Sequence, residues 1–189
     1  TAENPETFFT HREACNPYYD QVPEVVENYL AEISKITGRE YHLFSYYGAE
    51  DAERMIILMG SATEAAREAI DYLNANGEKV GMISVHLYRP FSVKHLLASV
   101  PKTVKKIAVL DRTKEPGANG EPLYLDVKDA YYDVEDRPVI VGGRYGLGSR
   151  DTTPAQIISV FNNLALPEPK NHFTVGIVDD VTFTSLPQV

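Results

Sequence analysis

The stretch RMIILMGSATEAAREAIDYLNANGEKVGMISVH, residues 54–86, decides the fold because it alternates between two structural patterns. Its two ends, 54–59 and 79–86, are short apolar runs typical of buried strands. Between them, 62–76 has helical spacing, with Ser61 and Glu64 placed as a capping box and Gly77 as the stop. The stretch therefore predicts a strand, a crossover helix and a second, parallel strand.

The same alternation continues toward the C-terminus. Further strands are predicted at 106–110, 137–141 and 172–177, and further helices at 93–99, 121–132 and 154–164. Ser92 and Thr153 stand at N-cap positions, and Pro154 follows at the first helical position. Five strands joined by four crossovers predict an α/β fold, a mostly parallel sheet with helices on both faces.

A different pattern precedes the sheet. Apolar residues at helical spacing predict an amphipathic helix over 20–38 that ends at Gly38, while Asn4-Pro5 and Asn16-Pro17 leave one short helix at most before it. We therefore divide the chain into a linker with an amphipathic helix, 1–52, and an α/β domain, 53–189. The start carries neither an initiator Met nor a signal peptide, so we expect a piece of a longer chain.

Composition excludes several classes of protein. The net charge of −9, from 18 basic and 27 acidic residues, argues against nucleic acid as a partner. The longest apolar runs are too short to span a bilayer. The single cysteine, Cys15, cannot form an internal disulfide or hold a cluster or metal alone, which indicates a reducing, cytoplasmic compartment. The histidines show no metal-ligand spacing, so no metal site is predicted.

Ligands of open α/β sheets bind beyond the carboxyl ends of the strands. The loops at that edge carry five basic residues that could hold an anion such as a phosphate: Arg89, Arg112, Lys114, Arg144 and Arg150. The glycines do not support a nucleotide site, since the first loop has Gly60, Ala62 and Ala65 and the 142–148 loop lacks a Walker A lysine. No residue set forms a catalytic machine, and we predict no catalytic residue.

Five long segments resemble pyruvate:ferredoxin (flavodoxin) oxidoreductases. They are VKKIAVLDRTKEPGANGEPLYLDV (104–127), VHLYRPFS (85–92), VGGRYGLGSRDTTPAQI (141–157), GREYHLFSYYGAEDAERMIILMGSA (38–62) and NHFTVGIVDDVTFTSLP (171–187). The resemblance covers essentially the whole chain. It implies a transketolase C-terminal-like domain, internal to a multidomain enzyme: a three-layer α/β/α sandwich with a five-stranded sheet, one strand antiparallel, behind a linking helix.

The resemblance also implies the chemistry of the parent enzyme. That family oxidatively decarboxylates pyruvate with coenzyme A to acetyl-CoA and CO2 and reduces ferredoxin or flavodoxin. It uses thiamine diphosphate with Mg, [4Fe-4S] clusters and coenzyme A. This chain has neither a thiamine-type Gly-Asp-Gly segment nor a cysteine set, so we expect it to bind none of these and to be inactive alone.

Our leading hypothesis is a non-catalytic organising domain that contacts other domains of its chain and a second subunit of a homodimer. The predicted contact residues are Asp111, Arg112, Lys114, Glu115, Gly117, Arg144 and Tyr145. One alternative is that the five basic residues help bind the phosphates of coenzyme A. Others are that the parent acts on another 2-oxoacid, or that the chain is a self-sufficient nucleotide-dependent enzyme, although it lacks that fingerprint.

Overall fold

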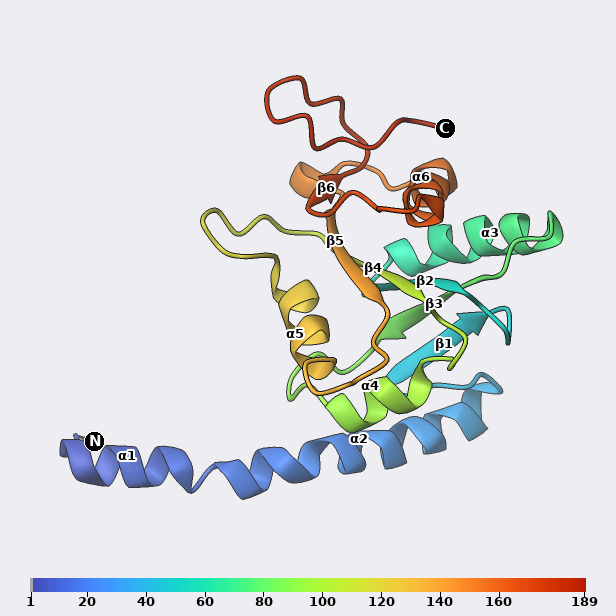
Figure 1. The fold of residues 1–189 in the computed structure, drawn as a ribbon. Coiled ribbons are helices and arrows are strands. Elements are labelled where there is room, and N and C mark those ends of the chain that lie inside the picture. Colours follow the sequence, from blue (N-terminus) through green and yellow to red (C-terminus); the bar gives the residue numbers. More distant parts are fainter. Residues whose placement is uncertain (1) are drawn as a thin grey trace.

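The computed structural model describes residues 2–189 as an α/β body preceded by two helices (Figure 1). In chain order the elements are α1 (Pro5–Glu13), α2 (Asn16–Thr37), β1 (Phe44–Gly48), β2 (Arg54–Leu58), α3 (Ala62–Ala75), β3 (Val80–Val85), α4 (Val93–Ser99), β4 (Lys106–Asp111), α5 (Pro122–Ala130), β5 (Val139–Arg144), the 3-10 turn η1 (Leu147–Ser149), α6 (Pro154–Ala165) and β6 (Phe173–Thr174). All five predicted strands and all four predicted crossover helices are present, but the last strand covers only Phe173–Thr174 of the predicted 172–177.

The sheet has the order β1-β3-β2-β4-β5-β6. Strands β2 to β6 pair in parallel, and β1 pairs antiparallel with β3 through Phe44 opposite Val85 and Gly48 opposite Gly81. The expected count of five strands is therefore wrong by one, because β1 adds a sixth at the edge. The α/β class and the single antiparallel strand are confirmed. Since β1 lies before residue 53, the sheet begins ahead of the predicted domain boundary, and that boundary stays a prediction.

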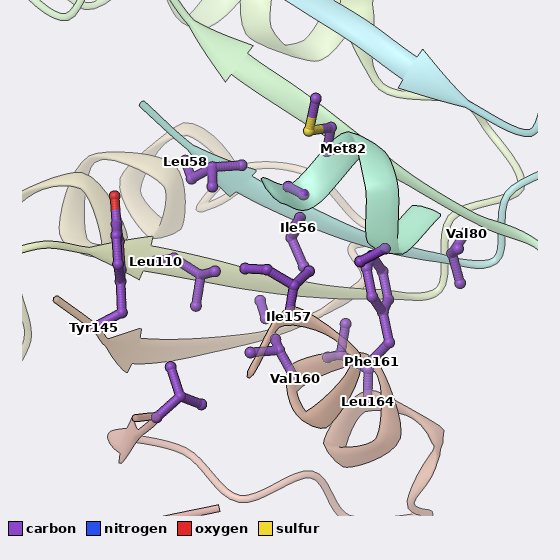
Figure 2. Close-up of a cluster of buried hydrophobic side chains, with 14 of the residues drawn as sticks. Ile56, Leu58, Val80, Met82, Leu110, Tyr145, Ile157, Val160, Phe161 and Leu164 are labelled. Atoms are coloured by element: carbon purple, nitrogen blue, oxygen red, sulfur yellow. The ribbon is translucent and has the colours of Figure 1, made fainter. Parts of the chain in front are cut away.

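Helices cover both faces of the sheet, as predicted. On one face α3 and α6 enclose a core that includes Ile56, Val160 and Phe161, all fully buried (Figure 2). On the other face α4 and α5 enclose Leu96, Leu123 and their neighbours, and α2 lies outside α4 (Figure 1). Both clusters are continuous apolar layers, so burial of the two sheet faces is what holds the body together.

The helix starts only partly follow the capping predictions. Thr153 accepts a hydrogen bond from the Gln156 N–H at 3.4 Å, as expected of an N-cap. Ser61 already has helical dihedral angles and makes no side-chain cap, so the predicted capping box is wrong. Ser92 also makes no cap, because its hydroxyl contacts His95 Nδ1 at 2.6 Å instead.

The first twenty residues are more helical than predicted. Asn4 caps α1 by accepting from the Thr7 N–H at 2.8 Å, and α2 begins at Asn16 rather than at residue 20. The two Asn-Pro pairs therefore mark helix starts and not breaks, since proline is favoured in the first turn of a helix. Within residues 2–189 no helix is both long and apolar enough to cross a membrane.

Candidate functional site

The carboxyl ends of β2, β3 and β4 surround a cavity of about 370 Å³. The chain runs from β2 to β3 on one side of β2 and then crosses to β4 on the other side, so β2 and β4 flank the point where the strand order reverses. Open α/β sheets bind ligands in the crevice at such a point. Arg112 is the only one of the five predicted basic residues that lines it. The lining is Met59, Gly60, Ser61, Tyr88, Leu110, Asp111, Arg112, Thr113, Pro122 and Tyr145. Such a wall is largely apolar and offers little for a polyanionic ligand.

Asp111, a predicted contact residue, has an internal role. Its two carboxylate oxygens accept from the backbone N–H groups of Leu123 and Tyr124, at 3.0 and 3.1 Å. Only 6% of the residue is exposed, and this burial raises the pKa of its carboxyl group, against the two backbone hydrogen bonds, which lower it. Asp111 thus binds the free N–H groups at the start of α5 and fixes that helix to the end of β4.

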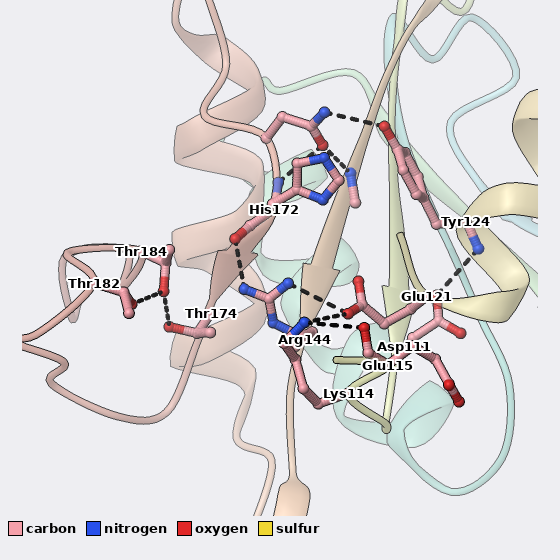
Figure 3. A network of polar contacts seen from close by, with 12 residues as sticks. Asp111, Lys114, Glu115, Glu121, Tyr124, Arg144, His172, Thr174, Thr182 and Thr184 are labelled. Atoms are coloured by element: carbon pink, nitrogen blue, oxygen red, sulfur yellow. Dashed lines mark hydrogen bonds and ion pairs between the residues drawn. The ribbon is translucent and has the colours of Figure 1, made fainter. Parts of the chain in front are cut away.

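Arg144, another predicted contact residue, belongs to a buried ion-pair network (Figure 3). Its Nη1 lies 3.4 Å from Glu121 Oε1, and its Nη2 donates to the His172 carbonyl at 2.8 Å. Lys114 Nζ approaches the same Glu121 oxygen at 3.6 Å. Because Glu121 is 1% exposed, these contacts pair its buried charge through Oε1, while Oε2 has no hydrogen-bond partner within residues 2–189. The network ties β5, the β4–α5 loop and the segment before β6 together.

Two further predicted contact residues make hydrogen bonds within the domain; Arg112 stays exposed, whereas Tyr145 is buried. Arg112 Nε donates to the Gly146 carbonyl at 2.9 Å, which links the β4–α5 loop to the loop after β5. Tyr145 is buried in the α3–α6 core, and its hydroxyl donates to the Met59 carbonyl at 3.4 Å. Burial raises the pKa of the Tyr145 hydroxyl. Tyr145 is therefore part of the core packing in this structure.

The tip of the β4–α5 loop, residues 114–119, is exposed throughout. The Ala118 N–H bonds the Glu115 carbonyl at 3.2 Å, and Gly117 has a φ of +83°, as expected of a turn with Pro116 at its second position. The tip is thus a defined turn that presents Lys114, Glu115 and Gly117 to solvent. Together with Arg112, these are the predicted contact residues that the structure leaves accessible.

A second cavity of about 270 Å³ lies beside this loop, between the β5 end and the C-terminal segment. Lys114, Arg144 and Arg150 all line it, so three of the five predicted basic residues meet. The hydroxyls of Thr174, Thr182 and Thr184 and the carboxylate of Asp179 complete the polar lining. Asp179 accepts hydrogen bonds from Thr182 and from the Val181 N–H, which lower the pKa of its carboxyl group.

Arg89 lies apart from the other basic residues. Its guanidinium pairs with Asp126 at 2.8 Å and stacks on the Tyr88 ring at 4.0 Å from the centroid. Burial, together with the nearby Asp126 carboxylate, raises the pKa of Tyr88 to about 12. Arg89 thus links the loop before α4 to α5, and it does not line the cavity that Lys114 and Arg150 line.

The glycines at the β5 end serve close packing. A Cβ on Gly142 would lie 2.9 Å from the Tyr124 ring, and one on Gly143 would lie 2.2 Å from the Phe173 ring. Each glycine lets an aromatic ring lie directly against the strand, on opposite faces. This explains why the glycine spacing matches no phosphate-binding fingerprint.

Sequence reasoning missed Glu121 and Asn171. Asn171 accepts from the Gly142 N–H at 2.8 Å and donates to the Tyr124 hydroxyl at 3.0 Å. An acidic residue directly before Pro122 was the available signal for Glu121, since acidic groups favour helix starts. No comparable local signal marks Asn171, whose partners lie far away in the sequence.

Residues 2–189 contain no group of three or more His, Cys, Asp or Glu side chains placed to hold a metal ion. The one cysteine of the chain cannot supply the four thiolates of an iron–sulfur cluster, so the chain's residues do not fit that cofactor.

The chain has clear relatives. The family described as pyruvate:ferredoxin oxidoreductase core domain II matches residues 52–157. The chain is 64% identical over 187 residues to a pyruvate-flavodoxin oxidoreductase of Enterobacter agglomerans, which covers 99% of this chain and 16% of the relative. It is 54% identical over 186 residues to the pyruvate:ferredoxin oxidoreductase of Moorella thermoacetica, with 98% and 16% covered.

A solved structure with some similarity is a 2-oxoglutarate:ferredoxin oxidoreductase from Magnetococcus marinus with 2-oxoglutarate, coenzyme A and succinyl-CoA bound. The TM-score is 0.47 at 24% sequence identity, with 65% of this chain and 19% of that chain covered. The chain thus spans about one sixth of the length of the curated relatives named above.

Proposed function

This chain belongs to the pyruvate:ferredoxin oxidoreductase core domain II family, and from that premise we propose that it is a non-catalytic organising domain of the longer enzyme. The proposed parent is a homodimeric, cytoplasmic pyruvate:ferredoxin (flavodoxin) oxidoreductase. It converts pyruvate and coenzyme A to acetyl-CoA and CO2 and reduces ferredoxin or flavodoxin. Residues outside 1–189 carry the thiamine diphosphate with Mg and the [4Fe-4S] clusters.

The observation that carries this proposal is the contrast within the β4–α5 loop. Its base is held by Asp111 and Glu121, while its tip is a defined turn with exposed charges. A loop ordered before binding loses little conformational entropy when a partner docks. We assign the contact with another domain or the second subunit to Arg112, Lys114, Glu115 and Gly117. Asp111, Arg144 and Tyr145 hold the loop in place for that contact.

The experiment exchanges the tip charges in the full-length enzyme by combining Lys114→Glu with Glu115→Lys. The net charge is unchanged, but an opposite-charge pair across a domain interface becomes a like-charge contact. Such a contact weakens the specificity and the alignment of domain docking. We expect lower pyruvate oxidation or weaker dimer assembly by sedimentation. Since Lys114 also pairs with the buried Glu121, Glu115→Lys alone is the matched variant: it should lower activity or assembly and leave the melting temperature of residues 1–189 unchanged. Full activity and assembly of the exchanged enzyme would refute the assignment.

A second candidate function is favoured by the cavity that Lys114, Arg144 and Arg150 share. Three basic groups and three hydroxyls suit the phosphates of coenzyme A, although Asp179 in the same lining opposes an anion. In the full-length enzyme, Arg150→Ala should raise the dissociation constant of coenzyme A measured by calorimetry, whereas Arg89→Ala, on the other side of the loop, should not. Equal affinities for both variants would remove this candidate.

The parent's substrate is tested separately. A purified full-length enzyme should turn over pyruvate in preference to 2-oxoglutarate. The opposite preference would make the parent a related 2-oxoacid:ferredoxin oxidoreductase, the remaining alternative. Residues 1–189 alone should show no turnover with either acid.

A further inference from the structure

Helix α2 has an apolar surface wider than the part that the α/β body covers. Its inner side packs on the α4–α5 face of the body through Val26 and Leu30. The position of the helix is fixed by polar contacts on the same side. Glu27 accepts from the Leu43 N–H at 3.0 Å and contacts His42 Nδ1 at 2.5 Å, and Ser34 accepts from the Tyr41 N–H at 2.9 Å. The orientation of α2 is therefore defined.

The adjoining side of α2 carries a second apolar row that stays largely exposed beside the body. We call it the outer row: Tyr18, Val25, Tyr29, Ile33 and Ile36, each between 44% and 84% exposed. Their spacing of three, four or seven residues places them in one stripe along the helix. Figure 1 shows that α2 lies at the outside of the molecule and runs past the edge of the body. The stripe is contiguous and not a set of scattered exposed side chains.

The outer row is not an ordinary solvent-facing surface. Helix α2 does have a polar side, formed by Gln21, Glu24, Glu32 and Lys35 at about 240–320° around the helix from Tyr18, given 100° per residue. The sequence thus separates a polar side from an apolar arc that extends over both the covered and the outer row. A contiguous exposed apolar patch on a soluble domain marks an interaction surface.

We propose that the outer row is a docking surface for an apolar face, rimmed by Lys or Arg, on another part of the same longer polypeptide. The relatives extend far beyond the aligned region, since this chain covers 16% of their length, so most of such a polypeptide lies outside residues 1–189. A surface tethered in the same chain has a high effective concentration and competes well with free partners. The acidic residues Glu24 and Glu32 beside the row favour a basic rim.

The same acidic border disfavours two other occupants. A second copy of α2 packed in parallel along the stripe would bring Glu24 and Glu32 toward their own copies, and like charges oppose such pairing; an antiparallel copy is an outcome of the sedimentation test below. Anionic lipid headgroups would be repelled for the same reason. This inference rests on the proposed function only in that the chain is one domain of a longer enzyme. The inference concerns the outer row of α2 and does not involve the β4–α5 loop.

The decisive experiment compares hydrogen exchange of α2 in residues 1–189 and in the full-length enzyme. A covered outer row suppresses local opening of the helix, so we expect α2 amides to be protected at least about tenfold more in the full-length enzyme. Helix α3, whose apolar side is already buried, should exchange similarly in both and serves as the internal reference. Equal protection of α2 in both forms would overturn the proposal. This comparison needs no variant.

A variant pair then tests the row itself. Tyr29→Asp should reduce the protection of α2 in the full-length enzyme, whereas Tyr72→Asp on α3 should not. Tyr72 is the matched control, because it is 60% exposed against 63% for Tyr29. Sedimentation of residues 1–189 as a dimer that Tyr29→Asp abolishes, or their binding to phosphatidylserine vesicles, would overturn the proposal in favour of a second copy or a membrane. If the charge exchange at the loop tip has no effect on activity or assembly while α2 stays protected, only the proposed loop contact is refuted.

Discussion

The base and the tip of the β4–α5 loop contain the same kinds of charged residue but use them in opposite ways. At the base, the carboxylates of Asp111 and Glu121 are buried. Asp111 accepts hydrogen bonds from N–H groups at the start of α5, and Glu121 pairs with the side chains of Arg144 and Lys114. At the tip, Lys114 and Glu115 stand on an exposed turn. The difference teaches that charge density in a strand-end loop does not by itself indicate a contact surface. The fold uses part of the charge to hold the loop and leaves the remainder exposed.

The largest effect is expected from Glu121→Ala at the base. The change leaves the Arg144 guanidinium buried with its carbonyl contact alone, and an uncompensated buried charge is strongly destabilising. We expect the free energy of unfolding of residues 1–189, measured with urea, to fall by about 3 kcal/mol. The matched control is Glu115→Ala at the tip, where the change should stay within about 0.5 kcal/mol. Equal losses at both positions would erase the distinction between base and tip.

Asp111→Ala should have the next largest effect. It leaves the N–H groups of Leu123 and Tyr124 without their acceptor at the start of α5. Removing a helix-capping acceptor of this kind costs about 1 to 2 kcal/mol, which thermal or urea unfolding would detect. A neutral result would mean that water replaces the carboxylate at no cost and that α5 does not depend on the end of β4.

The same residue predicts a pH dependence. Burial raises the pKa of the Asp111 carboxyl in the folded state above its ordinary value of 3.8, so folding favours the protonated carboxyl. This contribution to the free energy of unfolding is complete below pH 3.8 and is lost as pH rises through the raised pKa. Asn at this position does not titrate. The stability difference between the natural chain and Asp111→Asn should therefore narrow as pH rises from 4 toward neutrality. A difference that widens over that interval would show that the two N–H bonds outweigh burial.

Arg112→Ala sharpens the comparison at the junction between base and tip. It removes one hydrogen bond, from Nε to the Gly146 carbonyl, and we expect a loss of about 1 kcal/mol in residues 1–189. If Arg112 also contacts a partner, the full-length enzyme should lose more activity or assembly than this small loss of stability explains. A purely structural Arg112 would show no such excess.

The local order of elements could be predicted from the sequence because it depends on short-range patterns. The run at 54–59, the spacing of 62–76 and the Thr153-Pro154 start each predict their own element, and the structure contains all three. Strand β1 was missed because it is an edge strand of five residues whose partner, β3, lies more than thirty positions away in sequence. Its aromatic segment Phe44-Ser45-Tyr46-Tyr47 was an available signal, since aromatic residues favour strands.

The candidate site was less predictable than the fold. The sequence places Arg89, Arg112, Lys114, Arg144 and Arg150 on strand-end loops, but it does not say that Arg89 pairs with Asp126 while Arg144 pairs with Glu121. Ion pairs depend on distances of a few ångströms between segments that the sheet brings together. A helical pattern likewise identified α2, yet its apolar spacing alone did not show that one apolar row would remain exposed.

The sequence by itself determined the α/β class, the crossover helices and the family, because hydrophobic periodicity, turn residues and long motifs are properties of neighbouring residues. Only the tertiary structure decided which charges are internal and which face outward. Asp111 and Lys114 are three positions apart, yet the start of α5 folds over the first and leaves the second on the exposed turn. The physical reason is that burial, and with it the role of a charge, is set by contacts between segments distant in the sequence.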